Sequence, residues 1–350
     1  MDYSIIYKDE NEKYSAVFVS PIKYGGFTLL MRLCHNEIME VPIEEIEKYL
    51  EANPHEINKK HDGDDAVLSY IILNKDLNRE SIKLIKILLK KGADPNINIV
   101  LDRAITRATN RYGLQFKLIK LLLKHGADPN LISSFFGWTP LMYLITTKME
   151  LSLKLKLMEL LLENGADPDR CDNETMRPSL MICMLLPTDT YTKLKITKIL
   201  LKYGADPSIQ DCNGYTALMQ LLSSCDTEQK SKIIKVLLRK GTNPNLQNDD
   251  GETALMITIM NNNDPEIVSL LLEYGANHLV RNKNNISALQ IAHTRGNKNA
   301  IKFIRKRSLG KLLAKNQELY QKNILLRKIL DEVPEGKDIL NYSSELFQKA

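Results

Sequence analysis

A five-residue unit recurs along the chain at a nearly fixed interval, and this repetition constrains the fold more than any other feature. The copies read GADPN, GADPN, GADPD, GADPS, GTNPN and GANHL. They begin at Gly92, Gly126, Gly165, Gly204, Gly241 and Gly275, so the intervals are 34, 39, 39, 37 and 34 residues. Self-similarity at this period is typical of a solenoid, in which each repeat packs only on its neighbours.

Each glycine follows an apolar stretch with helical periodicity. In "SKIIKVLLRKG", residues 231–241, Ile and Leu recur at three- and four-residue steps, as in an amphipathic helix. Glycine enters the left-handed region without a Cβ penalty and therefore ends a helix well. In five of the six copies a proline three residues later prevents the helix from continuing. Each unit thus predicts the end of one helix and a polar turn after it.

A second signature follows each turn. Thr139, Thr216 and Thr253 each precede Pro/Ala-Leu-Met, and variants stand at 178–181 and 287–290. A Thr or Ser here can cap the backbone N–H groups of a new helix, with Pro or Ala favoured one step inside it. Before it, steps such as Asn213-Gly214 and Asp250-Gly251 tolerate the φ angles of tight hairpins. These turns are predicted to project as fingers.

The order helix, glycine, turn, Thr-Pro-Leu and helix resembles the ankyrin repeat over roughly residues 62–300. The resemblance implies an all-α repeat solenoid, an ankyrin-like stack of about eight helix-turn-helix units with short finger turns. We expect an N-terminal segment and degenerate capping repeat over 1–61, the solenoid over 62–308 and a C-terminal helical tail over 309–350. Two features depart from the family: extra residues separate the paired helices, and methionine replaces its usual histidine at Met142, Met181, Met219 and Met256.

The Lys-, Ile- and Asn-rich style of the copies is similar to the ankyrin-repeat proteins of giant and other large DNA viruses. Some intracellular bacteria carry similar proteins. The resemblance implies a role at the interface with a host, for instance the sequestration of a host protein.

Composition and charge give a first indication of the compartment. The net charge is +5, and residues 301–350, with 11 basic and 6 acidic residues, carry all of it. The five cysteines form no CxxC pair, as is typical of reduced thiols. No apolar run reaches the length of a membrane span, and the N-terminus lacks the pattern of a signal peptide. We therefore expect an intracellular protein, cytoplasmic or nuclear, without a membrane partner.

The motifs of catalysis are missing from the sequence. GxxxxGK[ST], GxGxxG and HExxH do not occur, and the six histidines are scattered over different copies. The Asp of the GAD units recurs in copy after copy, which favours a hydrogen bond that stabilises the turn. We expect no enzymatic activity, no cofactor and no metal.

The fingers and the first turns of the helices that follow them vary most between copies, so a partner is expected to bind there. Aromatic side chains in a polar turn are typical interface anchors, and packing on a neighbouring finger is the alternative. Tyr143, Ile182, Gln220 and Ile257 are predicted to begin the exposed edge of the first helices. The candidate contact residues are Phe135, Phe136, Trp138, Tyr143, Arg177, Ile182, Tyr215, Gln220, Asp249, Asp250 and Ile257.

The C-terminal tail carries its own pattern. Leu309, Leu312, Leu319, Leu326 and Leu330 form a heptad-like stripe with Asn316 and Asn323 on the same seam. We expect this segment to fold back and cap the last repeat; weak self-association through the 309–330 helix is the alternative. A basic cluster over 302–311 lacks interleaved aromatic residues, so we do not expect nucleic acid as the partner.

These observations predict a non-enzymatic scaffold that binds a host or cellular protein through its concave finger and first-helix surface. The alternative is an adaptor, whose tail recruits a second machinery, of the ubiquitin-ligase kind, to a target bound by the repeats. The partner itself is not encoded in any motif.

Overall fold

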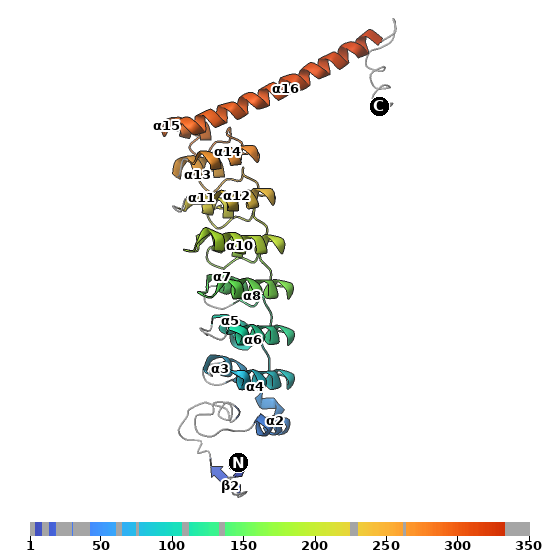
Figure 1. Cartoon of the computed structure of the whole chain (residues 1–350), viewed down its shortest axis with the longest axis vertical. Coiled ribbons are helices and arrows are strands. Elements are labelled where there is room, and N and C mark those ends of the chain that lie inside the picture. Colours follow the sequence, from blue (N-terminus) through green and yellow to red (C-terminus); the bar gives the residue numbers. More distant parts are fainter. Residues whose placement is uncertain are drawn as a thin grey trace. The chain divides into compact units, whose positions relative to one another are not determined.

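The computed structural model describes residues 4–8, 14–18, 30, 43–60, 65–74, 77–106, 112–132, 137–224, 230–261 and 264–332. At 4–8, 14–18, 74, 98, 112, 311 and 326–332 it describes the backbone alone. The chain divides into two compact units, Met1–Asp206 and Pro207–Ala350, and each is a stack of paired helices (Figure 1).

In unit 1 the array begins with the single helix α2, Ile43–Ala52, and the 3₁₀ turn η1, Pro54–Glu56. Four helix pairs follow, in which the first helix is called inner and the second outer. The inner helices pack on one another in chain order, and so do the outer helices. The pairs are α3 (Val67–Asn74) with α4 (Arg79–Lys90), α5 (Val100–Thr106) with α6 (Tyr112–Lys124), α7 (Pro140–Thr146) with α8 (Leu151–Glu163), and α9 (Ser179–Leu185) with α10 (Thr190–Lys202); the 3₁₀ turn η2, Ile97–Ile99, precedes α5.

Unit 2 continues the pattern with three pairs and ends in one long helix. The pairs are α11 (Ala217–Ser223) with α12 (Lys230–Arg239), α13 (Ala254–Asn261) with α14 (Pro265–Glu273), and α15 (Ala288–Thr294) with α16 (Lys298–Glu332). Seven of the eight predicted pairs therefore lie within the described residues. Of the degenerate first pair, α2 is described as a helix, and of the inner helix predicted near Thr28 only the buried, helical Leu30 lies within the described residues.

The helix-ending glycines and the capping threonines have the conformations and hydrogen bonds that the sequence predicts. Gly126, Gly165 and Gly204 have φ between 88 and 92°, in the left-handed region at the end of their helices. The side chains of Thr139 and Thr216 accept hydrogen bonds from the backbone N–H three residues on, at 3.3 Å in both cases. The methionines that replace the family's histidine are core residues: Met142, Met181, Met219 and Met256 are at most 1% exposed.

The Asp of the GAD units has the turn role that was predicted. Oδ1 of Asp94 and Oδ1 of Asp128 each accept a hydrogen bond from the backbone N–H two residues on, at 2.8 Å. The residue at that second position then links neighbouring repeats. Asn96 donates from Nδ2 to the carbonyl of Gly126 at 3.0 Å and accepts from the N–H of Asp128 at 2.7 Å. Asn58, Asn130 and Asn245 make the same pair of bonds to the next repeat.

In three repeats with long linkers, a buried lysine of the outer helix donates hydrogen bonds to backbone carbonyls at the end of the inner helix. This lysine cap was not predicted from the sequence. Lys154 donates to the carbonyls of Ile145 and Thr147, and Lys193 donates to that of Met184 at 3.0 Å. Lys230 bonds the carbonyl of Ser224 in the same manner. Each of these lysines is at most 7% exposed and lies eleven residues before the glycine that ends its outer helix. Gln115 occupies that position in its own repeat and donates to the carbonyls of Ala104 and Ile105, both at 3.0 Å.

Two elements differ from the expectation. Residues Ser4–Lys8 and Tyr14–Phe18 form strands β1 and β2 of an antiparallel hairpin, since both are rich in the β-branched and aromatic residues that favour strands. The prediction that residues 309–330 fold back and cap the last repeat is wrong. The helix α16 starts as the outer helix of the last repeat, with Ala300 and Ile304 buried, and runs on unbroken through Leu309 (Figure 1).

Candidate protein-binding surface

The fingers are short hairpins held by hydrogen bonds within and between repeats. In unit 2, Gln210 Nε2 donates to the carbonyl of Gly214 at 2.6 Å and to that of Gln247, in the next finger, at 2.9 Å. Gln247 Nε2 repeats both bonds one finger further on, to Gly251 and Arg281. A backbone bond of 3.0 Å also joins the Asp249 N–H to the Asn213 carbonyl. Hydrogen bonds therefore join the fingers of unit 2 into one continuous edge.

Several predicted contact residues lie on that edge. Asp249 and Asp250 are exposed at a finger tip, whereas Tyr215 is half-buried. Gln220, also half-buried, donates from Nε2 to Oδ2 of the buried Asp211 at 3.0 Å. Asp211 in turn accepts the N–H groups of its own finger, so Gln220 is positioned by the turn beside it.

Unit 1 holds the aromatic part of the prediction. The rings of Trp138 and Tyr143 meet edge to face, with 5.3 Å between their centroids and 60° between their planes, and both side chains are half-buried. The pair joins the base of a finger to the exposed side of α7. Arg177 is half-buried in the following finger. Phe135 and Phe136 lie outside the described residues.

Two residues of the predicted edge are instead core residues. Ile182 is 7% exposed and Ile257 is 2% exposed, so the expectation that both begin an exposed edge is wrong. The reason is the packing of the inner helices. The helix α13 is covered by α11, α14 and α15, and α9 by α7 and α10, which leaves an aliphatic side chain at this position inside. The larger ring of Tyr143 reaches further out.

The structure adds one residue that the sequence did not single out. Met176 has φ of +56° and is 53% exposed at the tip of the finger over 171–178. The other described fingers place Gly137, Gly214, Gly251 or Asn285 in this conformation, which glycine and asparagine adopt most easily. The signal was available in the sequence, because Asn173-Glu174-Thr175-Met176 stands where a Gly or Asn is usual.

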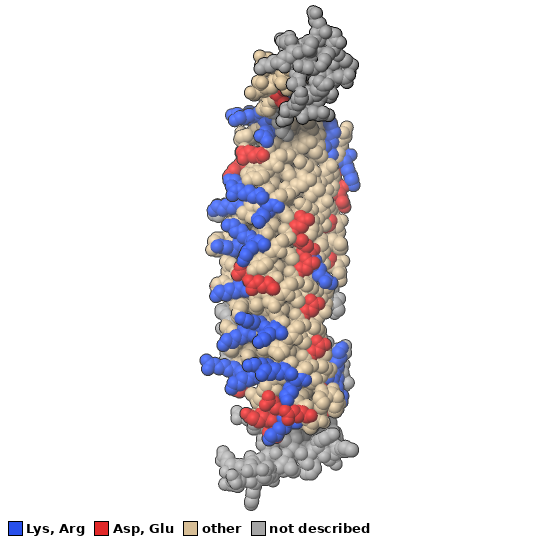
Figure 2. Space-filling view, turned by 90° about the vertical axis from the view of Figure 1, so that its right-hand side faces the viewer, with Lys and Arg blue, Asp and Glu red and all other residues tan. Residues whose placement is uncertain are grey.

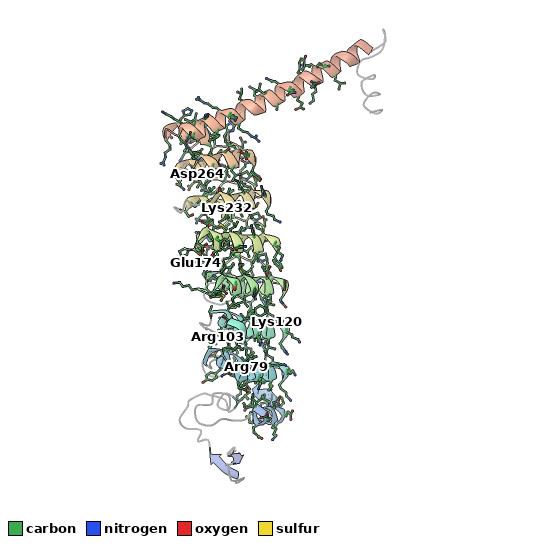
Figure 3. The ribbon with its side chains drawn as sticks, viewed as in Figure 1. Arg79, Arg103, Lys120, Glu174, Lys232 and Asp264 are labelled. Atoms are coloured by element: carbon green, nitrogen blue, oxygen red, sulfur yellow. The ribbon has the colours of Figure 1, made fainter. Side chains whose placement is uncertain are left out.

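Charge is distributed unevenly over the helices. Within each unit, Figure 2 shows most lysine and arginine side chains on one side, apart from acidic ones. In unit 1 the exposed lysines lie on the outer helices, for example Lys83 and Lys86 on α4 and Lys117 and Lys120 on α6, and Lys120 projects outward in Figure 3. Several of these cations pair with nearby carboxylates, as Lys202 does with Glu159 at 3.3 Å.

Cys171, Cys183 and Cys212, the cysteines of the described part of the chain, are unpaired thiols. Burial raises the pKa of the Cys183 thiol to about 12, so the thiol stays protonated and unreactive. Among the described residues, no three His, Cys, Asp or Glu side chains are grouped to hold a metal ion. No described helix is long and apolar enough to cross a membrane.

The comparison with protein families decides what this array is. The model of the family described as "Ankyrin repeats (3 copies)" matches residues 105–211 and 221–316, more than half of the chain. The chain belongs to the ankyrin-repeat family. Its fold is accordingly an all-α repeat solenoid, and ankyrin repeats generally mediate protein–protein interaction rather than catalysis.

A solved structure and the curated proteins complete the comparison of this ankyrin-repeat chain. It is similar to an ankyrin repeat domain from Acinetobacter baumannii AYE, with 26% identity, 60% of this chain and 97% of that chain covered, and a TM-score of 0.49. No curated protein matches the chain significantly.

Proposed function

We propose that this ankyrin-repeat protein is a non-enzymatic scaffold that binds a protein partner through its fingers and the adjoining turns of its inner helices. In unit 1 the contact residues are Trp138, Tyr143, Met176 and Arg177. In unit 2 they are Tyr215, Gln220, Asp249 and Asp250. The proposal extends to Phe135 and Phe136, which precede Trp138 in the same finger.

The strained Met176 supports this proposal most directly. A β-carbon in the left-handed region costs about 1 kcal/mol relative to glycine, and a large apolar side chain at the tip of a finger gains little burial in return. Backbone strain of this kind is concentrated at functional sites. Methionine is also well suited to an interface because its flexible thioether adapts to the surface it meets.

The Trp138–Tyr143 pair supports the same surface. Tryptophan and tyrosine are enriched among residues that dominate binding energy, since they bury a large area at little cost in conformational entropy. Their mutual edge-to-face contact holds both rings in place before a partner arrives. Such pre-organisation lowers the entropic cost of binding.

The partner that we propose is a host protein, met in the cytoplasm or the nucleus. The basis is the similarity of the repeats to those of large DNA viruses and intracellular bacteria. An adaptor role is the second candidate, and the long helix α16, which extends beyond the last inner helix, favours it.

The test is affinity capture from host-cell lysate followed by mass spectrometry, with the intact protein and the variants Trp138→Ala and Met176→Gly. Tyr191→Ala, which removes an aromatic ring that is 59% exposed on the outer helix α10, is the matched control. We expect a partner whose recovery falls at least tenfold with Trp138→Ala and Met176→Gly but not with the control. Circular dichroism verifies that all variants are folded. An unchanged set of partners in both finger variants would contradict the proposal.

A further inference from the structure

The last helix leaves an apolar stripe uncovered. Within the described part of the chain, every side chain from Leu312 to Leu325 is exposed except that of Ile324, which is half-buried. Leu309, Leu312 and Leu319 are 57, 55 and 49% exposed. Seen in Figure 3, this stretch of α16 extends away from α14 and α15, on which the start of the helix packs.

The stripe has the spacing of a coiled-coil seam. Leu309, Asn316 and Asn323 are seven residues apart, and Leu312 and Leu319 lie three residues after the first two of them. In heptad terms these are the a and d positions. Leu313 and Tyr320, 59 and 64% exposed, widen the seam at e, and Lys315 and Lys322 flank it at g. From Leu309 to Glu332 the helix has 24 residues, about 36 Å of length.

The charge of the helix indicates what would cover this seam. Residues 309–332 hold five basic and three acidic residues, so the segment carries a net charge of +2, and the acidic Glu318 already pairs with Lys322 at 3.2 Å. A second copy of this segment would also be net positive and would bring Lys315 and Lys322 but no acidic residue at the described e and g positions. An acidic helix would instead place carboxylates opposite Lys315 and Lys322, the arrangement that sets partner choice in coiled coils.

A lipid surface fits the stripe less well. Asn316 and Asn323 stand in the middle of it, and both are exposed. To bury a side-chain amide in hydrocarbon without a hydrogen-bond partner costs several kcal/mol. In a helix pair, a polar residue at an a position meets a polar group of the partner and fixes the register.

We propose that residues 309–332 of α16 are a second docking element, which pairs with an acidic amphipathic helix of a partner protein. Leucine side chains of both helices would interdigitate along the seam. Asn316 and Asn323 would set the register, and Lys315 and Lys322 would select an acidic partner. This inference goes beyond the finger surface, and together the two sites would let one chain hold two proteins.

The test uses the full chain and a designed helical peptide of four heptads with Leu at d, Asn at the a positions opposite Asn316 and Asn323, and Glu at e and g. A peptide with Lys at e and g is its counterpart. By fluorescence anisotropy we expect the acidic peptide to bind at least tenfold more tightly than the basic one. Raising NaCl from about 50 to about 500 mM weakens this binding several-fold, because charge pairs at the rim are screened.

Two pairs of variants separate the seam from the general charge of the helix. Leu312→Ser with Leu319→Ser weakens binding of the acidic peptide at least tenfold, whereas Leu325→Ser, equally exposed but off the seam at c, leaves it unchanged. Lys315→Glu with Lys322→Glu reverses the preference between the two peptides. The control variant Lys195→Glu with Lys198→Glu makes the same change in net charge on α10 and leaves the preference for the acidic peptide unchanged. None of these exposed substitutions removes a core contact.

Four outcomes would overturn the proposal. Equal affinity for the two peptides excludes charge selection. A homodimer in sedimentation equilibrium that Leu312→Ser abolishes makes a second copy the occupant. Binding to phosphatidylserine vesicles in place of the peptide makes it a lipid surface. If the acidic peptide binds only after residues 333–350 are deleted, that segment of the chain itself is the occupant of the seam. Met176→Gly leaves peptide binding unchanged, so failure of the finger surface and failure of α16 are distinguishable.

Discussion

The ammonium nitrogen of Lys154 lies 2.7 Å from the carbonyl oxygen of Ile145 and 2.7 Å from that of Thr147, at the end of α7. One buried cation thus satisfies two backbone acceptors that the helix itself leaves without partners. The same position holds Lys193, Lys230 and Gln115 in other repeats.

Replacing Lys154 with alanine should therefore destabilise the protein. A buried carbonyl left unsatisfied costs about 1–3 kcal/mol, so we expect Lys154→Ala to lower the free energy of unfolding by about 2 kcal/mol or more. Lys154→Gln should recover part of the loss, because Gln115 makes the same bonds. Urea denaturation measures both. Lys156→Ala, an exposed neighbour on α8, is the control, and equal effects of the two alanine variants would refute the capping role.

Asp102 gives the clearest dependence of stability on pH. Its carboxylate is 4% exposed, neither oxygen has a hydrogen-bond partner among the described residues, and burial raises its pKa from 3.8 to about 7. The folded state therefore keeps a proton that the unfolded chain releases above pH 4. Stability should fall as pH rises from about 4 to about 7, by up to about 4 kcal/mol, and level off above that.

Comparison of the repeats suggests a stabilising substitution at Asp102. The helix α5 reads VLDRAIT and α7 reads PLMYLIT, so Asp102 stands where the next repeat has the buried Met142. We expect Asp102→Met to raise the free energy of unfolding, and to raise it more at pH 8 than at pH 5. Urea midpoints at the two pH values decide this. A gain that is the same at both would show that the carboxylate does not titrate in this range.

Asp169 makes only one of the two kinds of hydrogen bond by which asparagine joins neighbouring repeats elsewhere in the chain. Its carboxylate accepts the N–H of Asp206 at 2.9 Å but has no proton to donate to a neighbouring carbonyl, as Asn130 donates to that of Gly165. Burial, with Asp167 and Asp206 nearby, raises the pKa of Asp169, so its ionisation at neutral pH destabilises the folded state. Asp169→Asn should stabilise the protein by about 1 kcal/mol at pH 7. Thermal unfolding tests it, and Asn130→Asp should have the opposite effect.

Gly214 is required for close contact between fingers as well as for its backbone angle. A β-carbon there would lie 2.9 Å from Asn248 Cα, whereas one at Gly241 would meet nothing within 4 Å, and both residues have positive φ. Gly241→Ala should cost about 1 kcal/mol from strain alone. Gly214→Ala should cost about 1–3 kcal/mol more, because the finger edge must shift. Equal losses of stability in chemical denaturation would mean that the fingers yield to the added methyl group.

The sequence predicted the repeats well because their signals are local. A glycine in the left-handed region, a proline after it and a capping threonine each act within a few residues, and the structure has all three. The burial of Ile182 and Ile257 could not be predicted in the same way, since it depends on neighbouring inner helices. The lysine caps were missed because a lysine in the first turn of an outer helix usually faces solvent. The unbroken course of α16 was missed because a heptad pattern does not say whether the helix has a neighbour.

The candidate site was predicted only in part. Trp138, Tyr143, Tyr215, Gln220, Asp249, Asp250 and Arg177 were singled out by their place in the repeat, and the structure describes each at a finger or beside one. Their role in binding stays a prediction. Met176 was missed because the absence of Gly or Asn at this finger position was not interpreted as a sign of a left-handed backbone angle.

The lysine cap also has a genetic consequence. Lys154 and the carbonyls that it bonds belong to the same repeat, so the contact does not depend on what lies on either side. Unequal crossing-over that duplicates or deletes a whole repeat would carry the donor together with its acceptors. Arrays of this kind can therefore gain or lose repeats over generations without leaving a buried carbonyl that lacks a hydrogen-bond donor.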